Sequence, residues 1–245
     1  MKKTNRNQSL DDISHHTNMD PHRQASDISD IILGGQDGLV NVLGIILGLA
    51  AATHDPWIVV VGGLAATFAE SVSMGAVAFT STLAEADYYE SEREREYRHI
   101  ESVPTLEKSE VRKIYLEKGF KDELLDRIVE TITANQDVWV AVMMSEEHQL
   151  APVDRRGAIK AALVVGFSAI IGSLIPLIPF ALFNVATSMW LSVLITTIVL
   201  FAVGAYKASK TVGHPLRSGL EMAAIGTISA LVGYLVGALL KIPMF

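Results

Sequence analysis

The chain has 245 residues, of which 50% are hydrophobic and 19% charged, and its formal net charge at pH 7 is −7. It contains no cysteine, which excludes disulfides, zinc–thiolate sites and iron–sulfur clusters. The negative charge also argues against nucleic acid as a partner, because nucleic-acid binding needs a basic face. Since the mean hydropathy is nevertheless +0.33, apolar spans and charged stretches are expected to alternate along the chain.

The first segment, residues 1–28, is polar and lacks the apolar core of a signal peptide. We expect a disordered tail here. Its three histidines, His15, His16 and His22, are interpreted as solvated side chains rather than as a metal site.

Five later stretches are apolar over about the 20 residues that a helix needs to cross a bilayer. They are Asp30 to Thr53, Trp57 to Leu83, Ala158 to Phe183, Ser188 to Ala208 and Ser218 to Ile242. The second stretch continues into charged sequence as far as about Glu101, which predicts one long helix that crosses the membrane and then enters water. The predicted organisation is spans 1 and 2 (29–84), a hydrophilic domain (85–156) and spans 3 to 5 (157–245).

Lys and Arg residues are unevenly distributed among the connections between these spans. The tail to Arg23 has four, the hydrophilic region 85–156 has eleven, the turn 207–217 has three, and the turns 54–56 and 184–187 have none. The positive-inside rule therefore predicts that the N-terminus and the hydrophilic domain are cytoplasmic. Five spans then place the C-terminus outside.

The hydrophilic domain is strongly acidic, with seventeen Asp and Glu against nine Lys and Arg between residues 85 and 150. Its pattern is helical throughout. The fold class that follows is an all-α membrane protein with five transmembrane helices and a cytoplasmic helical domain inserted between spans 2 and 3.

Turn residues divide this domain into helices. Val103-Pro104 is expected to end the long helix, with Thr105 capping a second helix through about residue 118. Gly119 fits a helix C-cap. Two further helices are predicted at 121–134 and 137–150.

Small residues and prolines mark particular places in the spans. Glycines recur as Gly44 with Gly48, Gly62 with Gly63 and Gly233 with Gly237. The pairs at four-residue spacing permit close helix crossing, although Gly is also common in membrane helices in general. Pro176 and Pro179 are expected to kink or locally unwind the third span.

Two acidic side chains lie within predicted spans: Asp37 with Asn41 one turn further on, and Glu70 with Met74 one turn further on. Acids are costly in a bilayer unless they serve a pathway or have a partner, so Asp37 and Glu70 are interpreted as functional. A carboxylate with a thioether suits Fe²⁺ or Mn²⁺ better than Ca²⁺ or Mg²⁺, and carboxylates also carry protons. The alternative is that Asp37 lies near the membrane interface and that Met74 is ordinary packing.

Possible metal ligands recur at helical spacing in the hydrophilic domain. They are Glu96 with His99, Glu107 with Glu110, and Met143, Met144 and Glu147 within one turn. Three helices thus each offer a face that can hold an ion. Each acidic group alone is also compatible with a solvated charge cluster. The two methionines are also compatible with a place in the hydrophobic core.

Several separate motifs together resemble the vacuolar iron transporter family, including its nodulin-like and bacterial members. They are Asp37-Gly38, Ser73-Met74-Gly75, Glu85-Ala86-Asp87, Val103-Pro104, Met143-Met144 with Glu147, and Arg217-Ser218-Gly219-Leu220-Glu221-Met222. The resemblance covers nearly everything after the tail. It implies a homodimer with five spans per chain that exports Fe²⁺ from the cytoplasm, into a vacuole or out of the cell, in exchange for protons.

The resemblance also implies roles for particular residues. An Asp of the first span and a Met of the second line the family's translocation path at the subunit interface, and these match Asp37 and Met74. Glu and Met side chains of a cytoplasmic domain gather metal in the family, and these match Glu96, Glu107, Glu110, Met143, Met144 and Glu147.

Two positions depart from the family pattern, because His99 and Leu150 stand where acids are expected. Imidazole still binds Fe²⁺, Mn²⁺ or Zn²⁺, so His99 is expected to keep the site while altering its selectivity and pH response. Leu150 removes a ligand, so fewer ions are expected to bind.

The hypothesis is a secondary active transporter of Fe²⁺ or Mn²⁺, not an enzyme, with no permanent cofactor. Its expected partners are metal ions, protons, the lipid bilayer and a second copy of the chain. The sequence lacks a Walker motif, so coupling to ATP within this chain is not expected. The ligand types do not rank Fe²⁺ against Mn²⁺.

The alternative is a membrane-anchored di-iron carboxylate ferroxidase, because Glu96 and His99 form a Glu-x-x-His motif. Enzymes of that class use two such motifs, and Glu147-His148 has the wrong spacing for the second. A metal sensor or scaffold would leave the acids of the first two spans unexplained.

Overall fold

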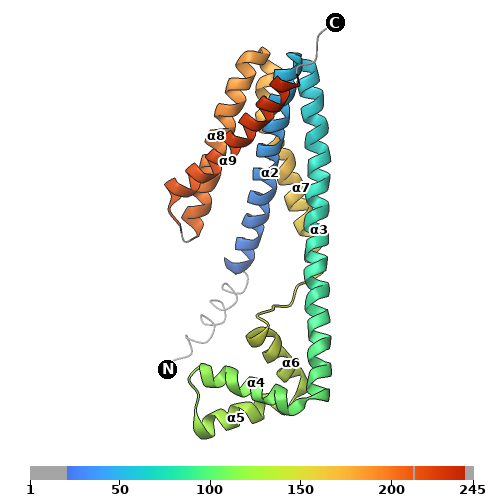
Figure 1. Ribbon diagram of the computed structural model, residues 1–245, viewed down its shortest axis with the longest axis vertical. Helices are drawn as coiled ribbons and strands as arrows, with labels where there is room; N and C mark the ends of the chain where they lie inside the picture. Colours follow the sequence, from blue (N-terminus) through green and yellow to red (C-terminus); the bar gives the residue numbers. More distant parts are fainter. Residues whose placement is uncertain (1–20, 212, 241–245) are drawn as a thin grey trace, which may run out of the picture. The chain divides into compact units, whose positions relative to one another are not determined.

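The computed structural model describes residues 21–211 and 213–240, and the regular structure within these ranges is entirely helical (Figure 1). The helices are α2 (Pro21–Thr53), α3 (Pro56–Ser102), α4 (Pro104–Glu117), α5 (Asp122–Thr133), α6 (Gln136–Val142), α7 (Gly157–Leu182), α8 (Val185–Lys210) and α9 (Pro215–Leu239), with one π-helical turn, η1 (Met143–Glu147). The predicted all-α class is confirmed.

The chain divides into two compact units. The first unit contains the described residues up to Ala78 and from Ile159 onward, and the second contains Phe79–Ala158. The second unit therefore contains the end of α3 and the helices that follow it in sequence before α7. Its location in the cytoplasm stays a prediction.

Five helices are long and apolar enough to cross a membrane: α2 from Ile28, α3, α7, α8 and α9. Large apolar side chains on these helices point outward, including Trp57, 73% exposed, and Trp190, 78% exposed. An outer surface of this kind is stable in lipid rather than in water. The five predicted spans are thus confirmed, including the continuous long helix, which runs from Pro56 to Ser102.

Within the described residues, α2 begins at Pro21, which lies inside the predicted tail. Residues 21–28, which we expected to be disordered, are helical here. Residues 1–20, with His15 and His16, lie outside the described residues.

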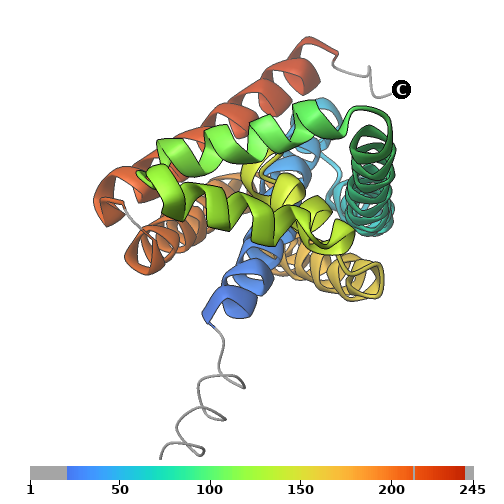
Figure 2. The same ribbon diagram turned by 90° about the horizontal axis from the view of Figure 1, so that it is seen from below.

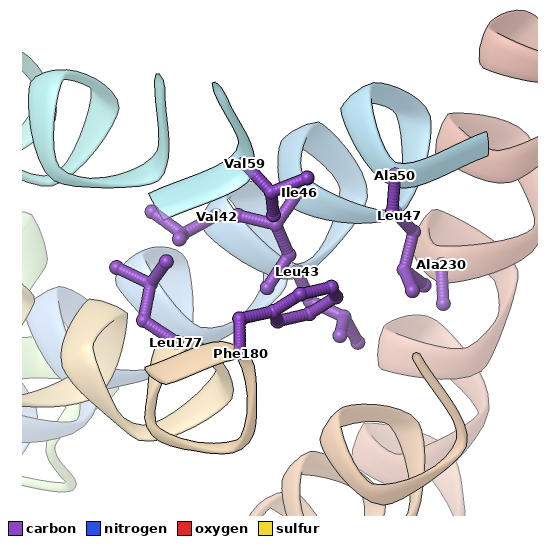
Figure 3. Close-up of a cluster of buried hydrophobic side chains, with 9 residues drawn as sticks. All are labelled: Val42, Leu43, Ile46, Leu47, Ala50, Val59, Leu177, Phe180 and Ala230. Carbon is purple, nitrogen blue, oxygen red and sulfur yellow. The ribbon is translucent and has the colours of Figure 1, made fainter. Parts of the chain in front are cut away.

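The core of the first unit is built around α2. Apolar residues on several sides of this helix are buried, as expected for a helix surrounded by others rather than one with a single apolar stripe. The cluster combines Val42, Leu43, Ile46, Leu47 and Ala50 of α2 with Val59 of α3, Leu177 and Phe180 of α7, and Ala230 of α9 (Figure 3). Helix α2 is thereby held against three neighbours.

Helices α2 and α9 cross with their backbones in contact, as the glycine pairs predicted. A Cβ added to Gly233 would lie 2.0 Å from the carbonyl oxygen of Gly44, and one added to Gly237 would lie 1.9 Å from that of Gly48. Real Cβ atoms do not approach carbonyl oxygens so closely, so only glycine permits this crossing.

Helix α7 continues through Pro176 and Pro179 from Gly157 to Leu182, so the predicted local unwinding does not occur. The hydroxyl of Ser192 donates to the carbonyl of Pro176 at 2.6 Å, and that of Ser188 donates to the carbonyl of Pro179 at 2.9 Å. Hydroxyl groups of a neighbouring helix thus stabilise the backbone near both prolines.

The second unit packs α4, α5, α6 and η1 with the end of α3, and Figure 2 shows α4 and α5 side by side. Its core consists of Ile100, Val111, Leu125, Val129, Ile132, Trp139, Val140, Met143 and Met144. Gly119 follows α4 with a φ of 97°, which confirms the predicted C-cap.

Two local predictions in this unit are wrong. Thr105 does not cap the second helix, because α4 begins at Pro104 with Val103 as its N-cap and no side-chain cap bond. The fourth predicted helix, 137–150, is not a single α-helix, since α6 passes into the π turn η1 at Met143.

We predict that Gly233→Ala destabilises the protein by about 1–3 kcal/mol, because the new methyl group overlaps the Gly44 carbonyl and must separate α2 from α9. Gly157→Ala is the matched control, since nothing lies within 4 Å of a Cβ at that position. Thermal unfolding in detergent compares the two variants. Equal melting temperatures would contradict the observed crossing.

Candidate metal site and membrane groove

A cavity of about 380 Å³ in the second unit gathers most of the predicted metal ligands. Its lining includes Glu92, Arg95, Glu96 and His99 of α3, Glu107 and Glu110 of α4, and Glu147 and His148. Five acids thus face one arginine and two histidines. Such an excess of negative charge favours a bound cation.

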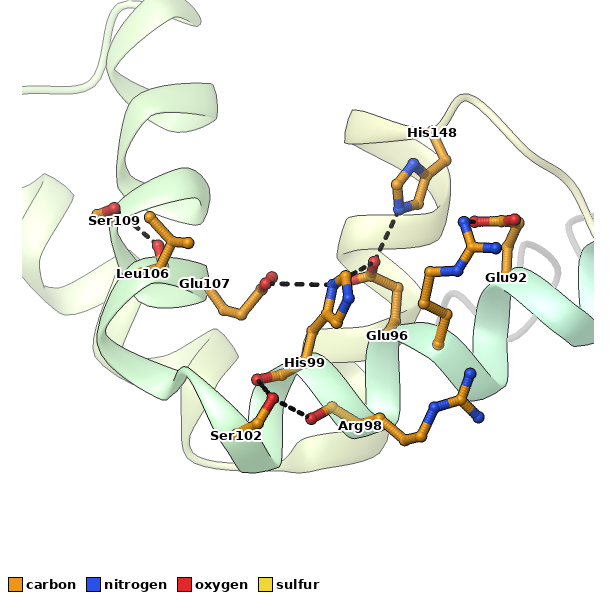
Figure 4. Close-up of polar contacts among 10 residues, drawn as sticks. Glu92, Glu96, Arg98, His99, Ser102, Leu106, Glu107, Ser109 and His148 are labelled. Atoms are coloured by element: carbon orange, nitrogen blue, oxygen red, sulfur yellow. Dashed lines mark hydrogen bonds and ion pairs between the residues drawn. The ribbon is translucent and has the colours of Figure 1, made fainter.

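Glu96, His99 and Glu107 form the centre of this cavity, with their ligand atoms all within 4.8 Å of one another. The Nδ1 atom of His99 lies 3.8 Å from Oε1 of Glu96 and 3.6 Å from Oε1 of Glu107. Figure 4 shows the three side chains converging from α3 and α4. Glu96 and His99 lie side by side because they are three residues apart on α3, and Glu107 lies near them because α4 packs against the end of α3.

The two central carboxylates are buried but incompletely paired. Glu96 is 3% exposed and Glu107 4% exposed. The Oε2 atom of each is buried and makes no hydrogen bond within the part of the chain that the structure describes. A buried carboxylate oxygen without a partner is unfavourable, so both oxygens are suited to accept a metal ion.

Burial and the closeness of several carboxylates raise the pKa values of acids in the cavity. Burial, with repulsion from Glu110 and Glu96, raises the pKa of Glu107 to about 7. Desolvation and the charge of Glu110 also raise the pKa of Glu147. The carboxylates therefore repel one another when no cation is bound, and a metal ion would compete with protons for them.

Met143 and Met144, which the sequence also suggested as ligands, lie elsewhere. They are 0% and 1% exposed and belong to the hydrophobic core of the second unit. Neither lines the cavity. In this structure the two methionines hold η1 in place, which is the core interpretation that the sequence left open.

His148 is a site residue that sequence reasoning missed. Its Nε2 atom lies 2.9 Å from Oε1 of Glu96, although 52 residues separate them (Figure 4). The π turn positions it, because the amide of His148 donates to the carbonyl of Met143, five residues earlier. A straight α-helix, on which bonded residues are four apart, gives no signal for this placement.

In the first unit, the structure brings together three of the four predicted path residues. The side-chain amide of Asn41 on α2 donates to Oε1 of Glu70 on α3 at 2.7 Å. Asp37, one turn before Asn41, is close enough to Glu70 for their charges to interact. Met74 is half-buried one turn beyond Glu70 on α3, and no described contact joins it to Asp37 or Asn41.

Asn41 and Glu70 line a groove of about 480 Å³ between α2, α3 and α9. A second groove of about 460 Å³ shares Gly44, Ile45 and Gly233 with it and reaches Leu240 near the end of α9. The two grooves therefore adjoin along the α2–α9 crossing. Apart from Asn41, Glu70 and Ser229, the side chains that line them are apolar or absent.

Comparison with known proteins assigns the chain to a family. Residues 28–238 match the family model described as the VIT family. The chain belongs to the VIT family. This confirms the resemblance to vacuolar iron transporters that the motifs indicated.

Relatives match over almost the whole chain. The chain is 31% identical over 223 residues to "Vacuolar iron transporter 1" of Oryza sativa subsp. japonica, covering 90% of this chain and 88% of the relative. It is 32% identical to "Vacuolar iron transporter 1" of Arabidopsis thaliana, covering 91% and 89%. It is also 32% identical to "Vacuolar iron transporter" of Plasmodium berghei (strain Anka), covering 93% and 89%. Together with its five apolar helices, this makes the protein an integral, multi-pass membrane protein.

We predict that Glu107→Gln stabilises the metal-free protein at pH 8 and reduces the stabilisation that added Mn²⁺ provides. Because the folded state raises the pKa of Glu107 from 4.5 to about 7, the stability from this group is present below about pH 4.5 and is lost as the pH rises through about 7. Gln stays neutral, so the variant avoids that loss, but it cannot offer a carboxylate to a metal. Thermal unfolding in detergent at pH 6 and 8, with and without Mn²⁺, measures both effects.

Glu123→Gln is the control, since the Glu123 side chain is 87% exposed and lies on α5 outside the cavity. It should behave as the wild type in all four conditions. If Glu107→Gln and the wild type melted together in metal-free buffer at pH 8, or gained equally from Mn²⁺, the assigned role of Glu107 would be wrong.

Proposed function

We propose that this protein transports Fe²⁺, or the chemically similar Mn²⁺, out of the cytoplasm in exchange for protons. The observation that carries the proposal is the pair of buried, half-paired carboxylates Glu96 and Glu107 in a cavity with a histidine between them. The names of the relatives, all vacuolar iron transporters, support iron as the cargo.

The second unit would collect the ion. Its cavity offers carboxylate and imidazole donors, a mixture that suits Fe²⁺ and Mn²⁺ and suits Ca²⁺ and Mg²⁺ less well. The acidic lining attracts cations from solution. We place this unit in the cytoplasm on the distribution of Lys and Arg described above.

The membrane groove would carry the ion across. Glu70 lines this groove, and Asp37 and Met74, which lie outside its lining about one turn from Asn41 and Glu70, would supply further ligands. The neutral amide of Asn41 donates a hydrogen bond to the Glu70 carboxylate. Carboxylates that release a metal ion take up protons, so metal and proton movement in opposite directions are coupled at the same groups. The proton gradient would supply the energy.

A second copy of the chain would complete this path. The groove that contains Glu70 opens to the outside of the first unit, and a carboxylate facing lipid is unfavourable. Covering the α2–α9 face with the same face of another chain would remove Glu70 from lipid. A homodimer, with its C-termini on the non-cytoplasmic side, is therefore part of the proposal.

A membrane-anchored ferroxidase is less well supported. Among the described residues, one group of three His, Asp or Glu side chains has the spacing to hold a metal ion, whereas a di-iron centre needs ligands for two irons. The relatives are also named as transporters rather than enzymes.

We predict that Asp37→Asn and Glu70→Gln each abolish metal transport in proteoliposomes while leaving folding intact. Both variants keep the size of the side chain and remove the charge that binds the ion and exchanges protons. Uptake of Fe²⁺ and Mn²⁺ is measured with and without an imposed pH gradient, with a dye that reports internal pH. Glu123→Gln, on the exposed face of α5, should transport like the wild type.

Each outcome decides a different part of the proposal. Wild-type transport by both variants would exclude the assigned path. Failure of the wild type to move either ion, with or without a gradient, would exclude the transporter, and oxidation of Fe²⁺ by the same protein would favour the ferroxidase. Metal uptake without opposite proton movement would exclude the exchange.

A further inference from the structure

His148 is placed in the cavity by the backbone rather than by chance rotation of a surface side chain. Its amide donates to Met143 at 3.2 Å, the amide of Leu150 donates to Met144 at 2.9 Å, and Gln149 between them adopts a φ of 56°. Both methionines that accept these bonds are fully buried. The Cα of His148 is therefore anchored to the core of the second unit, and its ring is only 28% exposed.

The distances around His148 match those between ligands of a single ion. Donor atoms about 2.1 Å from one metal ion lie about 3.0 Å apart at right angles and about 4.2 Å apart on opposite sides. The contact of His148 with Glu96 is 2.9 Å, and the contacts of His99 with Glu96 and Glu107 are 3.8 and 3.6 Å. All three fall within that range. Glu96, His99 and Glu107 already have ligand atoms within 4.8 Å of one another, and His148 joins them through its contact with Glu96. For one ion to bind all four side chains, the ring of His148 has to move closer to His99 and Glu107.

The carboxylate that His148 contacts through one oxygen has no partner for its other oxygen within the described residues. Oε1 of Glu96 receives both imidazoles, whereas Oε2 is buried without a hydrogen bond within the described residues. Oε2 of Glu107 is in the same state across the site. Two carboxylates that each keep one unpaired oxygen thus lie beside two imidazoles, and a cation bound among these side chains would supply the partner that the carboxylates lack.

We propose that His148 is a direct metal ligand, so that the cavity holds its ion with two imidazoles and two carboxylates, from His99, His148, Glu96 and Glu107. The consequence is selectivity for ions that favour nitrogen donors, with Fe²⁺, Co²⁺ and Zn²⁺ bound in preference to Mn²⁺, Mg²⁺ and Ca²⁺. This deepens the proposed function, on which it rests for the identity of the cargo, by choosing Fe²⁺ over Mn²⁺ at the collecting site.

Nitrogen donors produce this preference for a general reason. Affinity for divalent ions rises from Mn²⁺ through Fe²⁺ and Co²⁺, and imidazole suits Fe and Zn, whereas carboxylate and water ligands suit Mg²⁺, Ca²⁺ and Mn²⁺. A site of carboxylates alone therefore discriminates weakly against Mn²⁺. Each imidazole that replaces an oxygen donor increases the discrimination.

The experiment measures binding to the full-length protein in detergent by competition with a chromophoric chelator, for Zn²⁺ and Mn²⁺ separately. His148→Ala is expected to lower the ratio of Zn²⁺ to Mn²⁺ affinity by about tenfold or more. His148→Glu, which supplies oxygen in place of nitrogen, should also lower the ratio while retaining Mn²⁺ binding. His214→Ala removes an exposed imidazole outside the cavity and should leave the ratio unchanged.

A spectroscopic measurement separates a ligand from a residue that only orients Glu96. Electron spin-echo spectra of the Mn²⁺-loaded protein report nitrogen nuclei bonded to the metal, and coupling to two imidazoles is expected for the wild type and to one for His148→Ala. Coupling to a single imidazole in the wild type, or an unchanged affinity ratio in both His148 variants, would overturn the inference. Transport is not involved, so a wild type that binds with these signatures but moves no metal in proteoliposomes would contradict the proposed function alone.

Discussion

Two carboxylates, Glu96 and Glu107, are buried against each other with a single histidine between them. Removing such charges from water costs several kcal/mol for each ion, and only part is recovered here because one oxygen of each lacks a partner. The packed core beneath the cavity has to hold them together, and Met143 and Met144 of η1 belong to that core. A site of this kind is destabilising when empty and stabilising when a cation enters, which couples metal binding to the stability of the unit.

The first unit also contains a carboxylate that is removed from water, but there its partner is an amide rather than an imidazole. Glu70 lies in a helix that crosses the membrane, and Asn41 donates a hydrogen bond to it without neutralising its charge. A lysine or arginine there would pair with the acid permanently and exclude a metal ion, whereas an amide does not. The glycine crossing of α2 and α9 supports this arrangement, because it lets the backbones meet beside Gly44, close to the groove that Glu70 lines.

Much of this arrangement could be predicted from sequence, and the limits are physical. Hydropathy over about 20 residues located all five spans, because the bilayer fixes the length of apolar sequence that a helix needs. Helical spacing placed Glu96 beside His99, but no local rule joins α3 to α4, so Glu107 entered the same site only through tertiary packing. Thr105 failed as a cap because the proline before it already begins the helix.

The π turn explains both the missed histidine and the misplaced methionines. Spacing on a regular helix puts Met143, Met144 and Glu147 within one turn and suggests that all three face one ion. In the structure the turn is wider, the methionines face the core, and His148 contacts Glu96. A π turn has no reliable signature in a single sequence, since it depends on which side chains the core accepts.

The π turn also affects one of the two positions at which the family pattern leads us to expect acids. Leu150, which stands where an acid was expected, packs against the core of the second unit and offers no donor. His148, two residues earlier, contacts Glu96 instead, and His99 occupies the other expected acid position. In the proposed site the cavity therefore offers nitrogen donors in place of oxygen donors. If metal binds there as proposed, the departures from the pattern alter which metal is bound rather than whether one is bound.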